Sequence, residues 1–299
     1  FFMETLNACP ICQSGSFLPE LVAKDYTVSG KEFQIVKCAE CGLLFTNPRP
    51  TKLEIGPYYE SPDYISHSNS KKGLVNNIYQ WVRNRAIKEK LALVHKFSGK
   101  RDTIKLLDIG CGTGEFLASA KASGMQTKGI EPSAAAREHA IHNHQLNVEG
   151  EEGLEKLTES YDVISLWHVL EHVHDLRVRV QKIAGILNNR GVAIIAVPNP
   201  NSADRNTYNK EWAAWDVPRH LYHFTPTTIK RLFNDFSLKH EASIPMKYDA
   251  YYVSMLSERY RNNGKNNLPA ALLNGWKSNI RAGSNAELYS SVIYIFRKS

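Results

Sequence analysis

The sequence lacks long apolar runs, and neither sign of charge dominates it. No apolar stretch approaches the roughly 20 residues that a membrane-spanning helix needs, and the N-terminus has no basic region followed by an apolar one. The 37 lysines and arginines only modestly exceed the 30 aspartates and glutamates, without a concentrated run, so the net charge of +7 permits a nucleic-acid partner without requiring one. We therefore expect a soluble, cytoplasmic protein with no membrane span.

Cysteine is scarce, and most of it is clustered. Of five cysteines, four form two Cys-x-x-Cys pairs, Cys9 with Cys12 and Cys38 with Cys41, while Cys111 lies far along the chain. Disulfides would require an oxidising compartment, for which the N-terminus shows no export signal, whereas four thiolates in two tight turns suit tetrahedral Zn²⁺. We predict that the four paired cysteines hold one structural zinc ion with no open coordination position.

The surroundings of these pairs predict a small zinc-ribbon module over residues 1–50. The alternating pattern from Glu32 to Lys37 predicts a strand that delivers the second pair. Beyond residue 50 the chain becomes polar and rich in tyrosine, which indicates a connector, and apolar residues then recur at helical spacing over 74–98. We assign residues 51–98 to this connector and its helix.

The remaining residues, 99–299, alternate between strand and helix patterns. Such alternation is typical of a parallel sheet with helices on both faces, and it predicts a doubly wound α/β domain. An insertion at about 245–289 contains a helical pattern from Asp249 to Tyr260. The predicted strands are 103–108, 126–131, 146–149, 161–167, 191–198, 238–244 and 290–297, and the predicted helices are 114–122, 133–143, 175–188 and 226–236.

A glycine loop, Asp-Ile-Gly-Cys-Gly-Thr-Gly over 108–114, follows the first strand and opens a helix. Such a loop lets a ligand approach bare backbone at the carboxyl end of the sheet. The glycine spacing differs from that of dinucleotide folds, and Glu115 at the helix entrance disfavours a pyrophosphate. Glu131 ends the second strand, where a carboxylate can accept hydrogen bonds from both hydroxyls of a ribose.

With these motifs the chain resembles the class I S-adenosylmethionine-dependent methyltransferases. The resemblance rests on the glycine loop, on Glu131-Pro132-Ser133 and on Tyr161-Asp162-Val163-Ile164, and it covers about 100–240. It implies a Rossmann-like seven-stranded sheet and S-adenosyl-L-methionine as the cofactor. Asp108 would organise the loop, Gly110 and Gly112 would border the methionine part, Glu131 would hold the ribose and Glu151 would reach the adenine. The residues that it assigns to the cofactor are Asp108, Gly110, Gly112, Gly114, Glu131, Glu151 and Trp167.

Two further segments resemble methyltransferases that act on small molecules. Residues 41–50 look like the exit of the cysteine module in enzymes of sugar, polysaccharide and secondary-metabolite pathways. Residues 215–224 look like the segment after the fifth strand in that group and in its ubiquinone-pathway relatives. The resemblance implies a small-molecule acceptor, such as a sugar or another cell-envelope or secondary-metabolite precursor, methylated on oxygen or carbon.

Two other functions stay open. One is an RNA methyltransferase whose zinc module grips the substrate, and the other is a binding protein with an inactive cofactor fold. Against the first, Leu166-Trp167-His168 stands where enzymes that methylate base amino groups carry an Asn/Asp-Pro-Pro-aromatic clamp. Methylation at C5 of a pyrimidine needs a cysteine nucleophile, and Cys111 sits in the cofactor loop.

Histidines follow both the fourth and the fifth strand, and one of them is our candidate for a general base. The candidates are His168, His172, His220 and His223. His172 and His220 lead, because the carboxyl ends of parallel strands converge at one edge of a sheet. Some ubiquinone-pathway relatives resemble the 168–172 run but carry glutamate in place of His168, and there the side chains are associated with magnesium. His168, Glu171 and His172 would sooner suit a transition metal or none.

Overall fold

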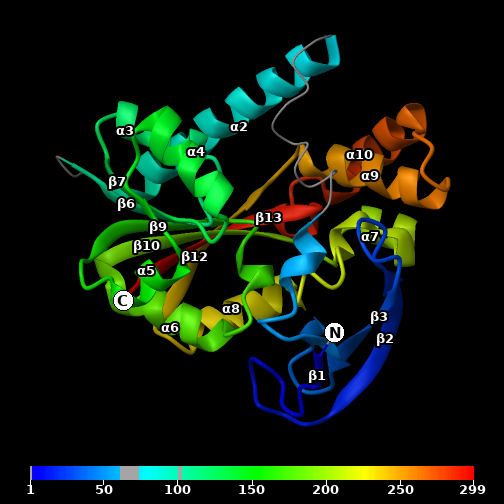
Figure 1. Ribbon diagram of the computed structural model, residues 1–299. Coiled ribbons are helices and arrows are strands. Elements are labelled where there is room, and N and C mark those ends of the chain that lie inside the picture. The colour runs from blue at the N-terminus through cyan, green and yellow to red at the C-terminus, as the bar shows by residue number, and fades with distance from the viewer. Residues whose placement is uncertain (1, 61–73, 100–102) are drawn as a thin grey trace.

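The computed structural model describes residues 2–60, 74–99 and 103–299, and its centre is a seven-stranded sheet. The strand order is β12-β13-β10-β9-β6-β7-β8, with β13 antiparallel to both of its neighbours and the other pairs parallel (Figure 1). This arrangement confirms the predicted doubly wound α/β fold. The strands are β6 (Lys105–Ile109), β7 (Gln126–Ile130), β8 (Val148–Glu149), β9 (Tyr161–Trp167), β10 (Leu187–Pro198), β12 (Leu238–Pro245) and β13 (Ser291–Lys298).

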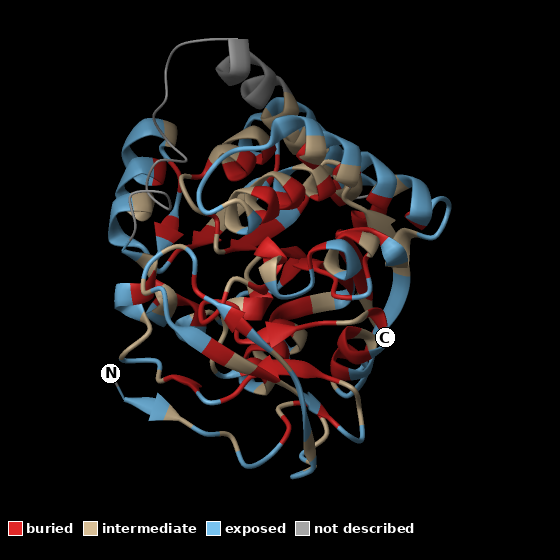
Figure 2. Cartoon of the chain, turned by 90° about the vertical axis from the view of Figure 1, so that its right-hand side faces the viewer, coloured by how far each residue is buried: buried red, intermediate tan, exposed pale blue. Residues whose placement is uncertain are grey.

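Helices cover both faces of this sheet (Figure 1). Alternation along β6 explains the two cores, because Leu106 packs with α2, α3 and α4 on one face while Leu107 packs with α5, α6 and α8 on the other. Buried residues accordingly concentrate in the middle of the molecule (Figure 2). The helices are α2 (Leu74–Ser98), α3 (Glu115–Ala122), α4 (Ala134–His144), α5 (Glu151–Lys156), α6 (Leu176–Ile186) and α8 (Pro226–Asn234).

Several predicted boundaries differ from the structure by two residues or more, and strand pairing accounts for two of these differences. The helix expected over 175–188 ends at Ile186, and β10 begins at Leu187, because Leu187 already pairs with Tyr161 ahead of an irregularity that precedes Val192. The strand expected over 146–149 is reduced to β8, an edge strand whose residues pair only with Gly129 and Ile130.

The N-terminal residues form small antiparallel sheets. The predicted strand over 32–37 is confirmed as β3 (Glu32–Cys38), which lies between β2 (Phe17–Lys24) and β4 (Leu44–Thr46). The fourth strand of this sheet is β11 (Tyr222–His223), which comes from the segment after β10 and places Tyr222 opposite Phe45. A separate pair joins β1 (Met3–Glu4) to β5 (Arg49–Pro50), and the 3₁₀ helix η1 (Gly56–Tyr59) follows.

The segments that follow β10 and β12 lie beyond one edge of the large sheet. After β10 come α7 (Ala203–Tyr208) and the 3₁₀ helices η4 (Asn209–Glu211) and η5 (Ala213–Trp215). Between β12 and β13 lie α9 (Asp249–Arg261), which confirms the helix predicted there, α10 (Leu268–Ala282) and the 3₁₀ helix η6 (Ala286–Leu288). In the described part of the chain, no helix is long and apolar enough to cross a membrane.

A buried arginine, Arg219, joins the N-terminal sheet to the large domain. Its side chain is 1% exposed and donates to Asp25 (3.1 Å), to Asp216 (2.7 Å), to the Thr27 hydroxyl (2.7 Å) and to the Tyr58 carbonyl (2.9 Å). Burial alone would raise the pKa of the Asp25 carboxyl, but hydrogen bonds from Ser29 and the charge of Arg219 lower it. Three segments far apart in the sequence are therefore held by one guanidinium.

We expect Arg219→Met to lower the free energy of unfolding by about 3–5 kcal/mol, because it leaves the carboxylates of Asp25 and Asp216 without their counter-charge. Urea unfolding followed by circular dichroism measures this loss. Lys52→Met is the control, since Lys52 and Asp175 form an exposed pair 3.5 Å apart and should contribute at most about 1 kcal/mol. Equal losses in the two variants would contradict the prediction.

Candidate active site

The glycine loop after β6 combines close packing with open backbone. Gly110 and Gly114 have φ values of +74° and +89°, and a Cβ atom built on them would lie 2.4 Å from Val169 and 2.6 Å from Leu146. Gly112 has a φ of +56°, but a Cβ atom there would meet nothing within 4 Å. The outer two glycines are thus required by packing, whereas Gly112 leaves room for a ligand to approach the backbone.

Glu131 lies directly on this loop. Its carboxylate accepts from the backbone N–H of Gly112 and from that of Ser133, both at 2.8 Å. Asp108 lies beneath the loop, where its buried carboxyl accepts from the Ser165 hydroxyl at 2.6 Å. Burial raises the pKa of Asp108 to about 7, against the opposing effects of that hydrogen bond and of the charge on Lys90.

Trp167, at the end of β9, forms a second wall beside the loop. Its ring packs edge-on against Phe116 of α3, with 5.6 Å between centroids, and the Lys90 ammonium lies 4.4 Å from the Trp167 ring. Burial lowers the pKa of Lys90. The indole Nε1 is buried and has no hydrogen-bond partner among the described residues. An unpaired buried donor of this kind suits a ligand that brings an acceptor.

Two other residues of the sequence prediction have different surroundings. Glu151, in the first turn of α5, forms an ion pair with Arg179 of α6, so its carboxylate is already engaged by a neighbouring helix. Cys111 is buried, and a Cβ atom added at Gly129 would lie 2.7 Å from its sulfur, which shows how closely the thiol packs on β7. Burial raises the pKa of Cys111, in keeping with a packing role.

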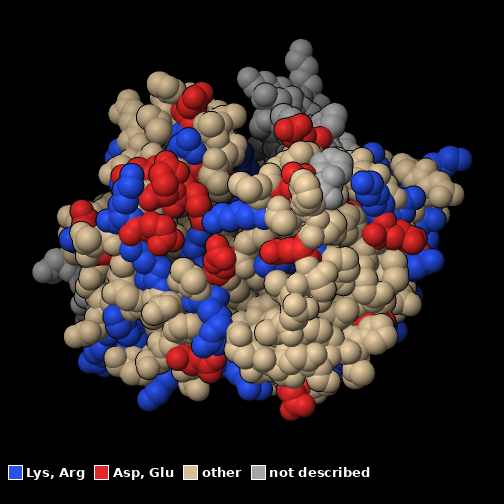
Figure 3. Space-filling model, turned by 60° about the horizontal axis from the view of Figure 1, so that its bottom comes forward, with Lys and Arg blue, Asp and Glu red and all other residues tan. Residues whose placement is uncertain are grey.

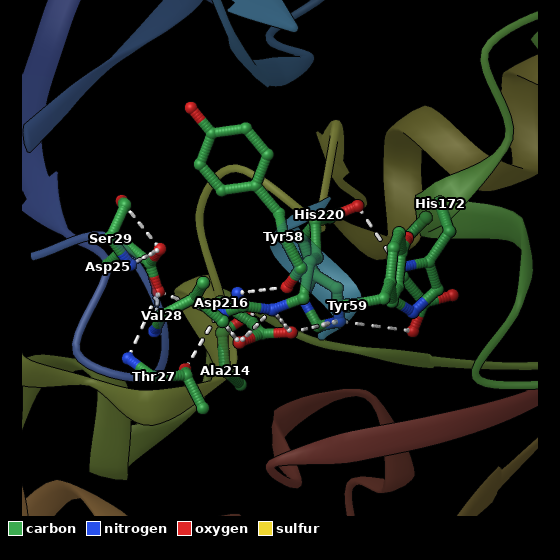
Figure 4. Close-up of polar contacts among 12 residues, drawn as sticks. Asp25, Thr27, Val28, Ser29, Tyr58, Tyr59, His172, Ala214, Asp216 and His220 are labelled. Carbon is green, nitrogen blue, oxygen red and sulfur yellow. Dashed lines mark hydrogen bonds and ion pairs between the residues drawn. The ribbon is translucent and has the colours of Figure 1, made fainter. Parts of the chain in front are cut away.

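The histidines predicted from the sequence gather beyond the ends of β9 and β10. His172 and His220 pack edge-on with 4.7 Å between ring centroids, and Figure 4 shows them in a continuous band of polar residues that reaches Asp25. Nδ1 of His172 lies 3.0 Å from the Arg219 carbonyl, and Nδ1 of His220 lies 2.9 Å from the Ala214 carbonyl. A carbonyl only accepts, so Nδ1 is the donor in both of these hydrogen bonds, and in a neutral ring with this tautomer Nε2 is the acceptor.

His168 and His223 have other partners. His168 directs Nε2 at Asp249 of α9 (3.1 Å) and Nδ1 at Glu171 (3.5 Å). His223, in β11, is buried with its ring 4.9 Å from that of Trp215, and its Nε2 has no hydrogen-bond partner among the described residues. The structure therefore brings His172 and His220 together, whereas His168 lies toward α9 and His223 lies in the N-terminal sheet.

Glu171 is the charged centre of this group. It is fully buried, and neither carboxylate oxygen has a partner at hydrogen-bonding geometry in the described part of the chain. His168 Nδ1 lies 3.5 Å and His220 Nε2 4.0 Å from its Oε1 atom. Ligand atoms of Glu171, His172 and His220 all lie within 4.8 Å of one another, so His220 rather than His168 completes the group that the sequence suggested.

The environment separates the protonation states of these histidines. Burial alone would lower the pKa of His168, but Asp249 and Glu171 raise it to about 10, so this ring is a cation at neutral pH. Burial and the neighbouring His220 lower the pKa of His172 to about 4, and burial lowers that of His223. A proton acceptor at neutral pH must be an unprotonated ring that is not too weak a base, which excludes His168 and disfavours His172.

The four paired cysteines meet where the turn before β2 approaches the turn after β3. The sulfurs of Cys9 and Cys41 lie 3.5 Å apart, as do those of Cys12 and Cys38, and all four sulfurs lie within 4.8 Å of one another. Gly42, with a φ of +77°, closes the second turn by donating its N–H to the Cys38 carbonyl at 3.0 Å. Two tight turns thus bring the thiols into one compact group.

Residues 81–242, more than half of the chain, match a family model described as a methyltransferase domain. The chain belongs to this family. It is 33% identical over 106 residues to a ubiquinone biosynthesis O-methyltransferase of Rhodopseudomonas palustris TIE-1. The matched residues cover 33% of this chain and 41% of that protein. It is 28% identical over 121 residues to the enzyme of the same name from Bartonella tribocorum, and this match covers 38% of this chain and 45% of that protein. The chain thus spans less than half the length of these relatives.

Solved structures share the fold of this methyltransferase domain. Magnesium protoporphyrin IX methyltransferase from Synechocystis PCC 6803, with bound SAH, matches with a TM-score of 0.52 at 13% identity, over 81% of this chain and 97% of that one. A putative sarcosine dimethylglycine methyltransferase from Galdieria sulphuraria matches with a TM-score of 0.51 at 19% identity, over 72% and 86%. At these identities the likeness concerns the fold alone.

Three residues of the candidate site were missed from the sequence. The Tyr59 hydroxyl lies 3.0 Å from His172 Nδ1, Asp249 pairs with His168, and Arg219 positions His172 through its carbonyl. Asp249 could have been found, because it follows β12, whose carboxyl end lies at the same sheet edge as those of β9 and β10. Tyr59 lies in a tyrosine-rich connector with no pattern that links it to a histidine 113 residues away.

Proposed function

We propose that this methyltransferase domain transfers the methyl group of S-adenosyl-L-methionine to a hydroxyl of a small molecule. The observation that carries the proposal is that two features meet at one edge of the sheet. The first is the backbone of Gly112, which is open to a ligand and donates to Glu131. The second is the pair His172 and His220, whose Nδ1 atoms are held by backbone carbonyls. The relatives named as O-methyltransferases favour oxygen as the methylated atom. An acceptor screen with nucleotide sugars and with ubiquinone-pathway compounds tests whether the acceptor is sugar-like, as the sequence suggests.

Nucleic acid is the less supported acceptor. On the face that Figure 3 presents, acidic and basic side chains are mixed over the left half and along the right margin, and a largely uncharged surface lies at the lower right of centre. A phosphate backbone is held by clustered cations. Neither that view nor the histidine site offers an observation that favours RNA over a small molecule.

The cofactor would lie across the glycine loop. S-adenosylmethionine supplies a methyl group already activated on a sulfonium, so the protein has mainly to place the acceptor in line with it. Glu131 would accept hydrogen bonds from the ribose hydroxyls, Gly112 would pass close to the methionine part, and the unpaired Nε1 of Trp167 would donate to an acceptor atom of the ligand. Glu151 would reach the adenine only by leaving Arg179.

We expect Glu131→Ala to weaken S-adenosylmethionine binding, because each lost hydrogen bond to a charged acceptor costs about 1.5–3 kcal/mol. Isothermal titration calorimetry with the purified chain measures the change. Glu152→Ala is the control, since Glu152 lies in the first turn of the neighbouring α5 and is exposed. Unchanged affinity in Glu131→Ala would place the ribose elsewhere.

His220 is our candidate for the base that takes the proton of the acceptor hydroxyl. Its Nδ1–H is fixed on the Ala214 carbonyl, so Nε2 is the accepting atom. The Glu171 carboxylate, 4.0 Å from Nε2, and the Asp216 carboxylate, 3.9 Å from it, would stabilise the positive ring once the proton has moved. His172, with its lowered pKa, would orient the acceptor through its free Nε2 atom rather than hold the proton.

We expect His220→Asn to lower turnover by about 10²–10⁴-fold while S-adenosylmethionine affinity stays nearly unchanged. Asparagine retains an N–H group that can serve the Ala214 carbonyl, so the variant removes the base with little disturbance of the loop. His223→Asn is the comparison within the same segment, and we expect a smaller loss of turnover. Near-native turnover in His220→Asn, and in alanine variants of His168, His172 and His223, would exclude histidine base catalysis and leave positioning alone.

The cysteine group would hold a structural zinc ion. Four sulfurs at about 2.3 Å from Zn²⁺ in a tetrahedron lie about 3.8 Å from one another, close to the 3.5 Å separations of the two measured pairs. All four ligands would come from protein, which leaves no position for catalysis at the metal. Its contribution would be to hold the turns that carry β3 and β4.

We expect one zinc ion per chain by elemental analysis of protein purified without chelators. Cys38→Ser should lose that zinc and expose the module to limited proteolysis, because so small a unit buries too little apolar surface to hold its own fold. Cys111→Ser should retain the full zinc content. Metal-free wild-type protein with an intact module would overturn the proposal.

A further inference from the structure

Helix α10 presents an unusual row of large apolar side chains to solvent. Leu272, Trp276 and Ile280 are 58%, 52% and 55% exposed, and Leu268 and Leu273 extend the row. Residues four apart lie on one face of a helix, so these side chains form a continuous stripe, which we call the α10 stripe. Singly exposed apolar residues need no explanation, but a contiguous group of this kind marks an interaction surface.

The α10 stripe is not the face by which the helix packs. Ala271, Gly275 and Ser278 are buried on the opposite side. A Cβ atom built on Gly275 would lie 2.9 Å from Tyr251 Cα, so small residues let α10 approach α9 closely. The packing requirement of the helix is therefore met without the stripe.

The charges around the stripe are almost all positive. Lys277 and Arg281 lie on the exposed side of α10, and Arg261 and Lys265 are exposed just before it. From residue 246 to residue 285 the chain has two acids, Asp249 and Glu258, and both point inward. Asp249 pairs with His168, and Glu258 is buried, where it accepts from Asn262 and Asn274.

The helix that carries the stripe belongs to the segment between β12 and β13, which contacts the histidine group. Strands β12 and β10 are both antiparallel to β13 and hence parallel to each other, so α9 begins, and the segment after α10 ends, at the sheet edge that carries the histidine group. The first turn of α9 contacts that group through Asp249. A partner that covers α10 would therefore stand at the helix pair α9 and α10, which lie side by side in Figure 1 and of which α9 contacts that group.

We propose that the α10 stripe docks the protein on the surface of an anionic lipid bilayer. A helix with leucine, isoleucine and tryptophan on its outer face and cations at its margin matches the boundary between lipid headgroups and acyl chains, where the apolar side chains insert and the cations meet lipid phosphates. A second copy of the chain fits less well. In a two-fold contact the same surface of each copy faces the other. The exposed face of α10 has no acid that could pair with Lys277 and Arg281 of a second copy.

Docking would hold α10 at the bilayer with α9, whose first turn contacts the histidine group, packed behind it, and an acceptor with an apolar tail could then reach the site from the lipid. This consequence rests on the proposed function, but the docking itself does not. Vesicle binding is therefore measured on the full chain with neither cofactor nor acceptor present, so that failure of docking and failure of methyl transfer are separate results.

The test uses vesicles of phosphatidylglycerol and phosphatidylcholine in equal parts, against vesicles of phosphatidylcholine alone. We expect co-sedimentation with the anionic vesicles and binding weaker by about tenfold or more with the neutral ones, given the contribution of each cation near an anionic surface. Tryptophan fluorescence should shift to shorter wavelength on binding, because Trp276 leaves water. Trp276→Phe should keep the binding and lose most of that shift, since Trp276 is the exposed one among the tryptophan side chains that the structure describes.

Variants separate the two parts of the surface. Leu272→Ser combined with Ile280→Ser should abolish co-sedimentation, and Lys277→Glu combined with Arg281→Glu should weaken it by at least about tenfold on anionic vesicles. Val178→Ser is the control, since Val178 is 55% exposed on α6, and it should bind as the wild type does. An unchanged thermal midpoint shows that each variant is folded.

Two results would overturn the proposal. One is an intact protein that does not bind anionic vesicles, or that binds them equally well with the Leu272→Ser and Ile280→Ser changes. The other is a dimer, seen by light scattering, that Leu272→Ser and Ile280→Ser convert to a monomer, because the α10 stripe would then be an interface between copies of the chain.

Discussion

The placement of the candidate catalytic groups depends on one buried ionic interaction, that of Arg219 with Asp25 and Asp216. The guanidinium reaches the loop between β2 and β3, the Tyr58 carbonyl and the segment after β10, while the carbonyl of the same residue accepts from His172. A buried cation is tolerated only where its donors are satisfied, so the three segments must close around Arg219 together. The position of His172 is thus fixed by the same contacts that join the N-terminal sheet to the large domain.

A second consequence of burial is the separation of charge within the histidine group. Glu171 is fully buried and has no partner at hydrogen-bonding geometry among the described residues, and its pKa is lowered by the histidines despite the opposing effect of burial. His168 supplies positive charge because Asp249 holds it on the other side. His172 stays neutral because burial and His220 disfavour a further charge. The Glu171 carboxylate therefore lies between the His168 cation and the His220 ring, where its negative charge would stabilise a proton taken up at His220.

The local parts of the site were predictable from the sequence, and the long-range parts were not. The glycine loop, Glu131 and the strand that precedes each of them follow from short-range patterns, because a strand, a turn and a helix start are encoded within a dozen residues. The contact of Arg219 with Asp25 spans 194 residues, and that of Tyr59 with His172 spans 113. No periodicity encodes such pairs. The pairing of β11 with β4 was missed for the same reason, since a two-residue strand carries no alternation of its own.

That short strand explains how the N-terminal sheet can matter to a site in the other part of the chain. The Thr46 hydroxyl of β4 donates to the His220 carbonyl at 2.9 Å, and the Thr46 N–H donates to the Leu221 carbonyl at 3.0 Å. Leu43 and Phe45 share a core with Leu221, and Cys38 lies in the same cluster. Hydrogen bonds to the carbonyls of His220 and Leu221 therefore come from a strand that begins three residues after the last paired cysteine. Displacement of β4 would move the His220 backbone while leaving the glycine loop and Glu131 on their own strands, so the acceptor side of the site should respond to the cysteine module and the cofactor side should not.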